Sequence, residues 1–414
     1  MIRETEISIC DFVCALSEVV DLISPALNFH HHRVAYIAGK IAFELHLPNN
    51  EIQEIILASM MHDIGAFSMS ERKNIMNFDA SEDDLNQHTV LGYKLLKNFE
   101  PLAGVATLIK YHHNAYSSQK TGIPLGSYII NMADRVSTVF DESHEILDQV
   151  PAVYEKISRE YHKFHPEVFA AFFRLAKIEY FMIEAFSPSF NTKMLTEMQY
   201  PKTIIDLNML RTFAEVIAHI IDFRSRFTAT HSIGVAAVAK ELSAIYGFSE
   251  RECKLMEIAG LLHDLGKLAV PNSILEKNGK LDEHEMNVIR KHTYYTYMVL
   301  CKVKGLEQIA AWAAHHHERQ DGNGYPFHIE QKDSFKLSRI MAVADVITAL
   351  TEDRPYRAGM SKEQTIEVLS TMAKTGGIDT GIVGIAVENF TRINDARLAA
   401  QSEVQKKYDA FWGA

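Results

Sequence analysis

The 414-residue sequence has few cysteines and lacks an excess of positive charge. Its four cysteines form no C-x-x-C pair, which excludes a thioredoxin-like redox motif and a disulfide scaffold. So few thiols in a chain of this length are typical of a reducing cytosol. The 42 basic and 53 acidic residues give a formal net charge of −11, so we expect no nucleic-acid polymer as partner.

Long apolar runs are also missing from the sequence. No uncharged stretch approaches the roughly 18 residues needed to span a bilayer. The N-terminal residues MIRETEISICDF are acidic where a signal peptide would be basic, and no cleavage site follows. We therefore expect a cytoplasmic protein that does not bind a membrane.

Glycine and proline are scarce, at 20 and 11 residues, which favours helices over loops and turns. In residues 31–45 and 251–267, apolar side chains recur at the i, i+3, i+4, i+7 spacing of an amphipathic helix. Few alternating runs of β-branched residues compete with these patterns. The sequence therefore predicts an all-α protein.

Histidine, in contrast, is abundant, with 20 residues. His30 and His62 are 32 residues apart, and so are His231 and His263. A lone histidine and a His-His pair then follow in each half with a spacing of 24 residues, and each half ends its series on an Ala-Asp pair. The first series is His30, His62, Asp63, His88, His112, His113 and Asp134; the second is His231, His263, Asp264, His292, His316, His317 and Asp345.

Such a repeat predicts two related helical domains in tandem. The periodic pattern breaks near residues 186–203, which contain two prolines and many polar residues. We therefore predict one domain over residues 1–190 and another over 204–414, with a long connecting helix over 203–227.

Imidazole and carboxylate groups in these numbers suit a pair of first-row transition metals better than Mg²⁺ or Ca²⁺. A single His-Asp dipeptide is a weak signal, but five histidines and two aspartates at matching intervals are a strong one. Adjacent helical residues point about 100° apart. We therefore expect that His263 and Asp264 do not share one buried apolar seam, although the carboxylate can bridge two cations while the imidazole binds one.

Two motifs in the second half carry a family resemblance. Residues 263–267, HDLGK, resemble the HDxGK motif, and residues 316–326, HHERQDGNGYP, resemble HHExxDGxGYP. Together they resemble the HD-GYP domain, the bacterial branch of the HD metal-dependent phosphohydrolases. The resemblance covers about residues 210–395, and a weaker HD resemblance covers about residues 25–150.

This resemblance implies a helical domain whose two- or three-metal centre, usually of iron or manganese, hydrolyses the phosphodiester of a cyclic dinucleotide, usually cyclic di-GMP, to the linear form. It implies metal ligation by His231, His263, Asp264, His292, His316, His317 and Asp345, with Asp264 bridging. It implies catalytic roles for Asp264 and Lys267, and substrate binding by Lys267, Arg354, Arg357, Gly322, Gly324 and Tyr325. Trinuclear members carry a glutamate where this chain has Phe227, so we expect a binuclear site.

Physical chemistry is consistent with that implied mechanism. Two cations ~3.5–4 Å apart can share a water whose pKa falls toward neutrality, which produces a hydroxide for attack on phosphorus. The cations and the basic side chains also offset the substrate's negative charge, so an acidic protein can bind it.

The first series keeps every ligand type, but its surroundings differ. Ala66 stands at the position of the HDxGK lysine, Asn114 at that of the glutamate after the His-His pair, and no GYP or RPYR sequence follows. We therefore predict a regulatory or degenerate HD domain. Its histidines either bind a metal, as in a sensor, or make helix-packing hydrogen bonds. His31 and His32 flank a candidate ligand but have no counterparts in the second series, so we assign them no metal role.

Three alternatives stay open at this stage. The substrate could be 3′3′-cyclic GMP-AMP (cGAMP) rather than cyclic di-GMP. The chain could instead be a non-catalytic adaptor that binds a protein partner, such as a diguanylate cyclase, through its GYP loop; Lys267 and the full ligand set argue against this. The aromatic stretch 169–186 suits core packing and is also a candidate homodimer face.

Overall fold

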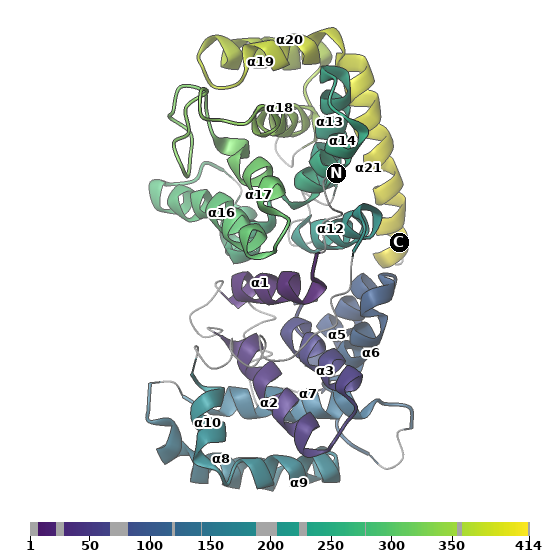
Figure 1. The fold of residues 1–414 in the computed structure, drawn as a ribbon, viewed down its shortest axis with the longest axis vertical. Helices are drawn as coiled ribbons and strands as arrows, with labels where there is room; N and C mark the ends of the chain where they lie inside the picture. The colour runs from purple at the N-terminus through teal and green to yellow at the C-terminus, as the bar shows by residue number, and fades with distance from the viewer. Residues whose placement is uncertain are drawn as a thin grey trace. The chain divides into compact units, whose positions relative to one another are not determined.

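The computed structural model describes residues 7–21, 29–66, 82–117, 121–141, 143–187, 205–222, 230–277, 279–353 and 358–412. Every regular element within these ranges is a helix, which confirms the all-α prediction (Figure 1). None of the helices in these ranges has the length and hydrophobicity that crossing a bilayer requires.

The chain forms two compact units. The N-terminal unit comprises residues Leu16–Pro201, and the C-terminal unit comprises Lys202–Ala414 together with Met1–Ala15. The division therefore falls inside the first helix, α1 (Ile9–Asp21), whose Phe12 ring packs edge-on against Phe213 of the C-terminal unit at 5.0 Å between centroids.

The described residues of the N-terminal unit form a series of helices. In chain order these are α2 (His30–Glu44), α3 (Asn49–Met61), α5 (Glu82–Leu96), η2 (Glu100–Leu102), α6 (Ala103–Tyr111), α7 (Leu125–Val139), α8 (Ile146–Arg159), η3 (Tyr161–Lys163), α9 (Pro166–Leu175) and α10 (Glu179–Ala185). Helix α2 packs against α3 and α7, and α5 packs against α6.

The C-terminal unit repeats this arrangement and adds helices after it. Its elements are α12 (Leu207–Asp222), α13 (His231–Tyr246), α14 (Glu250–Leu262), η4 (Leu265–Ala269), α15 (Asn272–Leu275), α16 (Glu283–Lys302), α17 (Glu307–Ala314), η5 (His315–His317), α18 (Lys336–Thr351), α19 (Lys362–Lys374), α20 (Thr380–Glu388) and α21 (Phe390–Trp412). Helix α13 packs against α14 and α18 as α2 does against α3 and α7, and α16 packs against α17 as α5 does against α6.

The central helix of each unit is buried on nearly every side. In α2, the four apolar residues of the predicted stripe, Val34, Ile37, Ala38 and Ile41, have no exposed surface. Removing apolar surface from water at roughly 25 cal/mol per Å² makes such a helix a fixed part of the core. Each central helix also begins with a candidate ligand, His30 in α2 and His231 in α13, so the core fixes where these imidazoles lie.

The connecting helix is observed as α12, Leu207–Asp222, within the predicted 203–227. Residues 205–206 precede the helix, and residues 203–204 and 223–227 lie outside the described ranges. Its apolar face, including Leu210, Phe213 and Ile217, is buried within the C-terminal unit.

Capping boxes define where two ligand-bearing segments of the C-terminal unit begin. Ser249 caps α14 with Glu252, and Asp282 caps α16 with Glu285. Each cap satisfies backbone N–H groups that the helix leaves free and contributes about 1 kcal/mol. The caps therefore fix the register of the helices that lead to His263 and carry His292.

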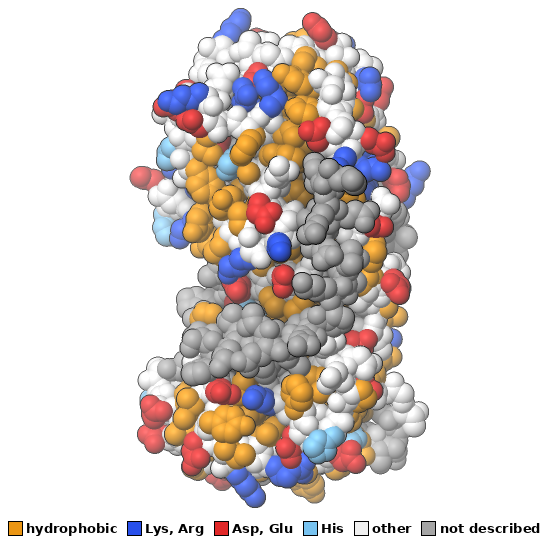
Figure 2. All heavy atoms as spheres, viewed as in Figure 1, with side chains coloured by type: hydrophobic (Ala, Val, Ile, Leu, Met, Phe, Trp, Pro, Cys, Tyr) orange, Lys and Arg blue, Asp and Glu red, His pale blue; other side chains and the backbone are white. Residues whose placement is uncertain are grey.

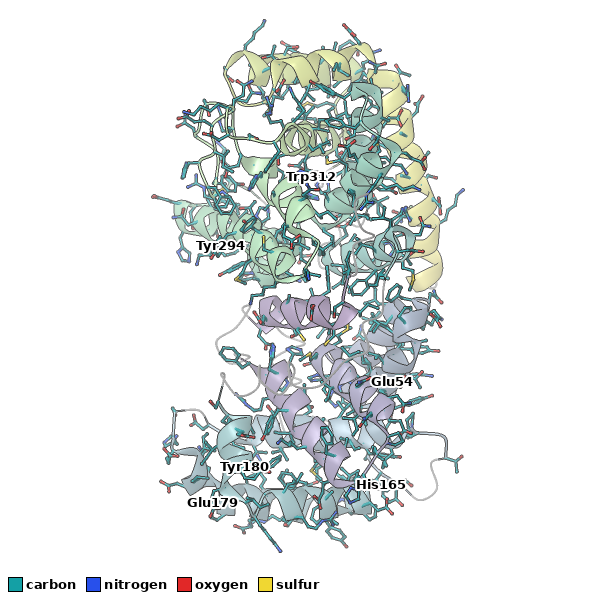
Figure 3. All side chains as sticks on the ribbon, viewed as in Figure 1. Glu54, His165, Glu179, Tyr180, Tyr294 and Trp312 are labelled. Atoms are coloured by element: carbon teal, nitrogen blue, oxygen red, sulfur yellow. The ribbon has the colours of Figure 1, made fainter. Side chains whose placement is uncertain are left out.

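The surfaces of the two units agree with the balanced composition. On the face drawn in Figure 2, acidic and basic side chains are interspersed among apolar ones across the described residues. Figure 3 shows Trp312 of α17, which is only 6% exposed, inside the C-terminal unit, whereas Tyr294 of α16 is 49% exposed.

Candidate metal centres

The His-Asp pair of the C-terminal unit lies where a helix ends. Helix α14 ends at Leu262, His263 follows as its C-cap residue, and Asp264 directly precedes η4. We expected that these two side chains do not share one buried seam, and that prediction was wrong, since both are at most 2% exposed. The 100° offset applies within a continuous helix, and here the backbone leaves the helix between the two residues.

One group of candidate ligands lies near the Oδ2 atom of Asp264. The Nε2 atom of His263 lies 3.2 Å from Asp264 Oδ2, and His231 Nε2 lies 3.3 Å from Oδ1 of Asp345. His231, His263 and Asp264 together offer ligand atoms within 4.8 Å of one another. Helices α13 and α14 follow one another in the chain, and α18, which carries Asp345, comes much later, so the fold brings these side chains together.

A second group gathers on the other oxygen of Asp264. The Oδ1 atom lies 3.3 Å from His292 Nε2 and 3.9 Å from His316 Nε2. His292, His316 and His317 form a further set with ligand atoms within 4.8 Å of one another. Asp264 therefore has one oxygen toward each group, which is the arrangement that a carboxylate bridging two cations requires.

Hydrogen bonds orient these imidazoles. The Nδ1 atoms of His263, His292 and His316 each donate to the backbone carbonyl three residues earlier, at 2.6–2.8 Å. Metal-binding histidines usually donate one ring N–H in this way, which fixes the tautomer and frees the other nitrogen. In the described residues, His263 Nε2 and Asp264 Oδ1 are buried without a hydrogen-bond partner, so these donor atoms fit bound cations.

Electrostatics favours the protonation states that bind metals. Burial and the neighbouring histidines lower the pKa of His316 well below its usual value and that of His317 to about 3. Burial opposes ionisation of Asp264, but His263 and Lys267 outweigh it and hold its pKa well below its usual value. These imidazoles are therefore neutral and this carboxylate is charged, as ligation requires.

His231 differs from these imidazoles. Burial lowers its pKa, but Glu352 and Asp345 outweigh that effect and raise it to about 10. Its Nδ1 donates to Glu352 Oε2 at 2.9 Å, and Glu352 in turn accepts a hydrogen bond from Gln401. His231 must therefore release a proton when a cation binds at its Nε2.

The N-terminal unit repeats this geometry. The two oxygens of Asp63 lie 3.3 Å from His62 Nε2 and 3.3 Å from His88 Nε2. His30 Nε2 lies 3.4 Å from Oδ1 of Asp134. Two of the sets of candidate ligands that result are His30, His62 and Asp134, and Asp63, His88, His112 and His113.

The inward nitrogens of His62, His88 and His112 make no interhelical hydrogen bond among the described residues. His62 and His112 donate from Nδ1 to Ser59 and Ile109 of their own segments, both at 2.7 Å. Their Nε2 atoms, and that of His88, are buried without a partner in the described residues. This favours a metal-binding role over the alternative that they only link helices.

The N-terminal unit has an alanine where the C-terminal unit has the lysine of its HDxGK motif. In the C-terminal unit, Lys267 Nζ lies 2.5 Å from Asp264 Oδ2 and the lysine side chain is 25% exposed. The equivalent Ala66 is fully buried. Position 66 of the N-terminal unit therefore offers no positive charge to a substrate phosphate.

His31 departs from the sequence prediction, which gave it no metal role. It lies in a set with His62 and Asp63 whose ligand atoms are within 4.8 Å of one another, and its Nδ1 contacts Asp21. Burial opposes ionisation of Asp21, but His31 and His32 lower its pKa to about 2. The missing counterpart in the second half was therefore not a reason to exclude His31.

The loop that follows the His-His pair folds back so that its backbone packs directly against residues 317–319. A Cβ atom on Gly324 would lie 2.4–2.6 Å from the backbone of residues 317–319, so only glycine fits there. Gly322 has a φ of 72°, which also favours glycine. Tyr325 lies with its ring 4.9 Å from that of His317 and donates its N–H to the His317 carbonyl at 3.2 Å. The two glycines thus shape the turn, and Tyr325 reaches the candidate ligands.

Glu318 holds this loop from inside. Its carboxylate accepts the backbone N–H of Phe327 at 2.7 Å and of Ile329 at 3.0 Å, and the residue is 7% exposed. We expect Glu318→Gln to destabilise the C-terminal unit by about 1–3 kcal/mol, because an amide replaces one charged acceptor with a donor. Thermal unfolding measures this effect.

Glu330→Gln is the matched control, because Glu330 is exposed and its carboxylate pairs with the exposed Lys332 at 3.2 Å. It should change stability by at most about 0.5 kcal/mol. Equal thermal unfolding midpoints for Glu318→Gln and Glu330→Gln would contradict the role given to Glu318.

Three of the predicted positions lie outside the described residues: Arg354, Arg357 and Phe227. The structure adds residues that the sequence did not point to. Thr296 Oγ1 accepts the Gly266 N–H at 2.9 Å and donates to the His263 carbonyl at 3.1 Å, which fixes the His-Asp turn against α16. Glu352 orients His231. Only the fold reveals either contact, since neither residue belongs to a repeated spacing.

Comparisons with known proteins match both halves of the chain. A family model for the HD domain matches residues 215–382, and another HD-domain model matches residues 29–139. The chain is 30% identical to 3′3′-cGAMP-specific phosphodiesterase 1 of Vibrio cholerae, over 87% of this chain and 86% of the relative. It is 34% identical to a cyclic di-GMP phosphodiesterase of Pseudomonas aeruginosa, over 41% of this chain and 38% of that protein.

The fold is similar to a solved structure as well. A crystal structure of a cyclic GMP-AMP specific phosphodiesterase of V. cholerae superposes with a TM-score of 0.63 over 95% of this chain and 98% of that one. The sequence identity is 22%, so this likeness concerns the fold alone.

Proposed function

This chain belongs to the HD family of metal-dependent phosphohydrolases, with HD-GYP motifs in its second half, and we therefore propose that its C-terminal centre hydrolyses a cyclic dinucleotide to the linear dinucleotide. The observation that carries the proposal is the position of Asp264, whose two oxygens face two groups of imidazoles while Lys267 Nζ lies 2.5 Å away. The N-terminal cluster shares the ligands but not the lysine.

The residues fit two cations. His231, His263, Asp264 and Asp345 would hold one, and Asp264, His292, His316 and His317 would hold the other. Ligands of mixed imidazole and carboxylate character suit iron or manganese. When bound, such a pair supplies Lewis acidity at phosphorus and lowers the pKa of a water between the metals.

The chain's own side chains bind and orient the substrate. Lys267 is partly exposed, and its ammonium can bind a non-bridging phosphate oxygen beside Asp264. Tyr325 lies against His317 with the Arg290 guanidinium 5.7 Å from the centre of its ring, so this side of the site offers an aromatic surface and a positive charge. Arg354 and Arg357 are proposed to bind phosphate as well.

Hydrolysis adds one water across one phosphodiester bond. The water oxygen forms a bond to phosphorus, the bond from phosphorus to a ribose oxygen breaks, and that oxygen takes up a proton. The charged groups that surround the phosphate stabilise the transition state more than the ground state, because negative charge on its oxygens increases during attack.

We further propose that the division of labour follows the two predicted domains, with regulation in residues 1–190 and catalysis in residues 204–414. The N-terminal domain would bind metal through His30, His62, Asp63, His88, His112, His113 and Asp134, without hydrolysing the phosphodiester. This is supported by its buried unpartnered donor atoms and by the alanine at position 66.

The sequence favoured cyclic di-GMP as substrate, and several relatives are named for it. A relative that aligns with 87% of this chain is named for 3′3′-cGAMP instead, which supports that dinucleotide as a second candidate. Both share the cyclic phosphodiester backbone and at least one guanine, so both fit a site that acts on phosphate.

Incubating the Mn²⁺-loaded or Fe²⁺-loaded protein separately with the two dinucleotides tests the proposal. We expect chromatography to resolve a linear dinucleotide from at least one of them, and the ratio of kcat/KM values to give the preference. No product from either, with bound metal measured in the same sample, would contradict the proposal and favour the adaptor alternative.

A further inference from the structure

An aspartate contacts the start of the central helix in both units. Asp21 lies nine residues before His30, and Asp222 lies nine residues before His231. In the C-terminal unit, Asp222 accepts hydrogen bonds from the Ser232 hydroxyl at 2.8 Å and from the Ser232 N–H at 3.0 Å. The residue at the corresponding position of the N-terminal unit is His31.

Ser232 is sufficient to join its helix to the preceding aspartate. An imidazole at position 31 makes the same connection through Nδ1, which donates to Asp21 Oδ1. It also carries a second nitrogen, which a serine lacks. Histidine in place of serine therefore gives the N-terminal unit a second ring nitrogen, Nε2, that the hydrogen bond to Asp21 does not use.

The His31 ring lies beside the N-terminal cluster, with one of its nitrogens within 4.8 Å of ligand atoms of His62 and Asp63. The His31 ring is 5.1 Å from the ring of His62 and 5.5 Å from that of His30, centre to centre. His31 and Asp21 are 1% and 5% exposed. Next to them, His62 Nε2 and Asp63 Oδ1 are buried without a hydrogen-bond partner in the described residues.

We propose that His31, oriented by Asp21, is an additional ligand of the N-terminal metal centre, where it joins His62 and Asp63 in binding a divalent first-row transition metal. Carboxylate, imidazole and metal in this order form a common arrangement in which the carboxylate fixes the ring and makes the ligand more basic. The inference rests on metal binding by the N-terminal unit, which is part of the proposed function.

An extra protein ligand changes what the centre can do. Catalytic metal sites keep one position open for water or substrate, whereas structural sites fill all positions with protein groups. In the C-terminal unit the corresponding residue, Ser232, offers no imidazole, and its hydroxyl donates to Asp222, so His31 would add a ligand that the C-terminal centre does not have. The N-terminal metal is therefore held more tightly and is less accessible to a substrate, in agreement with the alanine at position 66.

His31→Ser tests this in the full-length chain, because serine reproduces the Ser232–Asp222 contact and removes only the imidazole. Both proteins that are compared also carry His263→Ala, which weakens the C-terminal metal site. The most tightly bound Zn²⁺ then reports the affinity of the N-terminal metal site. Zn²⁺ is titrated in metal-buffered solution, and metal per chain is measured by mass spectrometry after dialysis. We expect the N-terminal affinity to fall at least ~10-fold.

His32→Ser is the matched control, because His32 is also buried and lies near Asp21 but belongs to none of the ligand sets found among the described residues. It should leave Zn²⁺ affinity unchanged. Unchanged affinity in His31→Ser, with a normal unfolding midpoint, would overturn the inference while leaving the N-terminal metal site in place. No tight Zn²⁺ in the His263→Ala background would overturn both the inference and the N-terminal metal site, and neither result bears on catalysis by the C-terminal centre.

Discussion

Replacing His263 by alanine together with Asp264 by asparagine should lower kcat/KM for the cyclic dinucleotide at least about a thousandfold, equivalent to ~4 kcal/mol of transition-state stabilisation. Asp264 faces both groups of imidazoles, so its loss affects both proposed cation positions at once. Asparagine keeps the shape but not the charge. Steady-state kinetics with Mn²⁺ in excess measures the effect.

The repeat supplies the matched control. His62→Ala with Asp63→Asn makes the same change in the N-terminal cluster, where His62 and Asp63 have nearly the same geometry. We expect this variant to lose at most about tenfold in kcat/KM, since Ala66 stands where the proposed catalytic centre has Lys267. Equal losses in the two double variants would contradict the assignment of catalysis to the C-terminal centre.

Gly266→Ala should have the largest effect on stability. A Cβ atom there would lie 1.9 Å from the His292 carbonyl oxygen and 2.9 Å from the backbone nitrogen of Thr296. Both atoms belong to the backbone of α16, which cannot move aside without displacing His292 from the cluster. We expect a cost of about 3 kcal/mol or more, which lowers the unfolding midpoint of the C-terminal unit by roughly 6–12 °C.

Gly384→Ala is the control for this substitution. Gly384 lies in α20, and a Cβ atom on it would meet no atom within 4 Å. Alanine is favoured over glycine in a helix by up to about 1 kcal/mol, so this variant should be as stable as the parent or more stable. An unchanged midpoint for Gly266→Ala in calorimetry would show that α16 does not pack against residue 266 as closely as described.

The ligand series could be predicted from sequence because metal ligands must converge, and two copies of one domain preserve the same intervals. The equal spacings from His30 to His62 and from His231 to His263 reflect helices α2 and α3, and α13 and α14, packed in the same way. Buried apolar stripes were equally visible, since helical periodicity determines which side chains face the core.

Other features depended on backbone detail that periodicity does not contain. The burial of both His263 and Asp264 follows from the end of α14, and a helix end is uncertain by one or two residues when judged from sequence. Symmetry between the halves does not point to His31, because this position holds histidine in one half and serine in the other. Glu352 approaches His231 from 121 residues away, a contact that only the tertiary fold makes evident.

Hydrolysis in water enriched in ¹⁸O tests the central claim most directly. The metal-loaded protein is mixed with the cyclic dinucleotide, and the mass of the product is measured by mass spectrometry. Attack of one water on phosphorus at the C-terminal centre predicts a linear dinucleotide with one ¹⁸O in its terminal phosphate, formed by the parent chain and not by the His263→Ala, Asp264→Asn variant. An unlabelled product, or labelled product formed equally fast by that variant, would contradict the account.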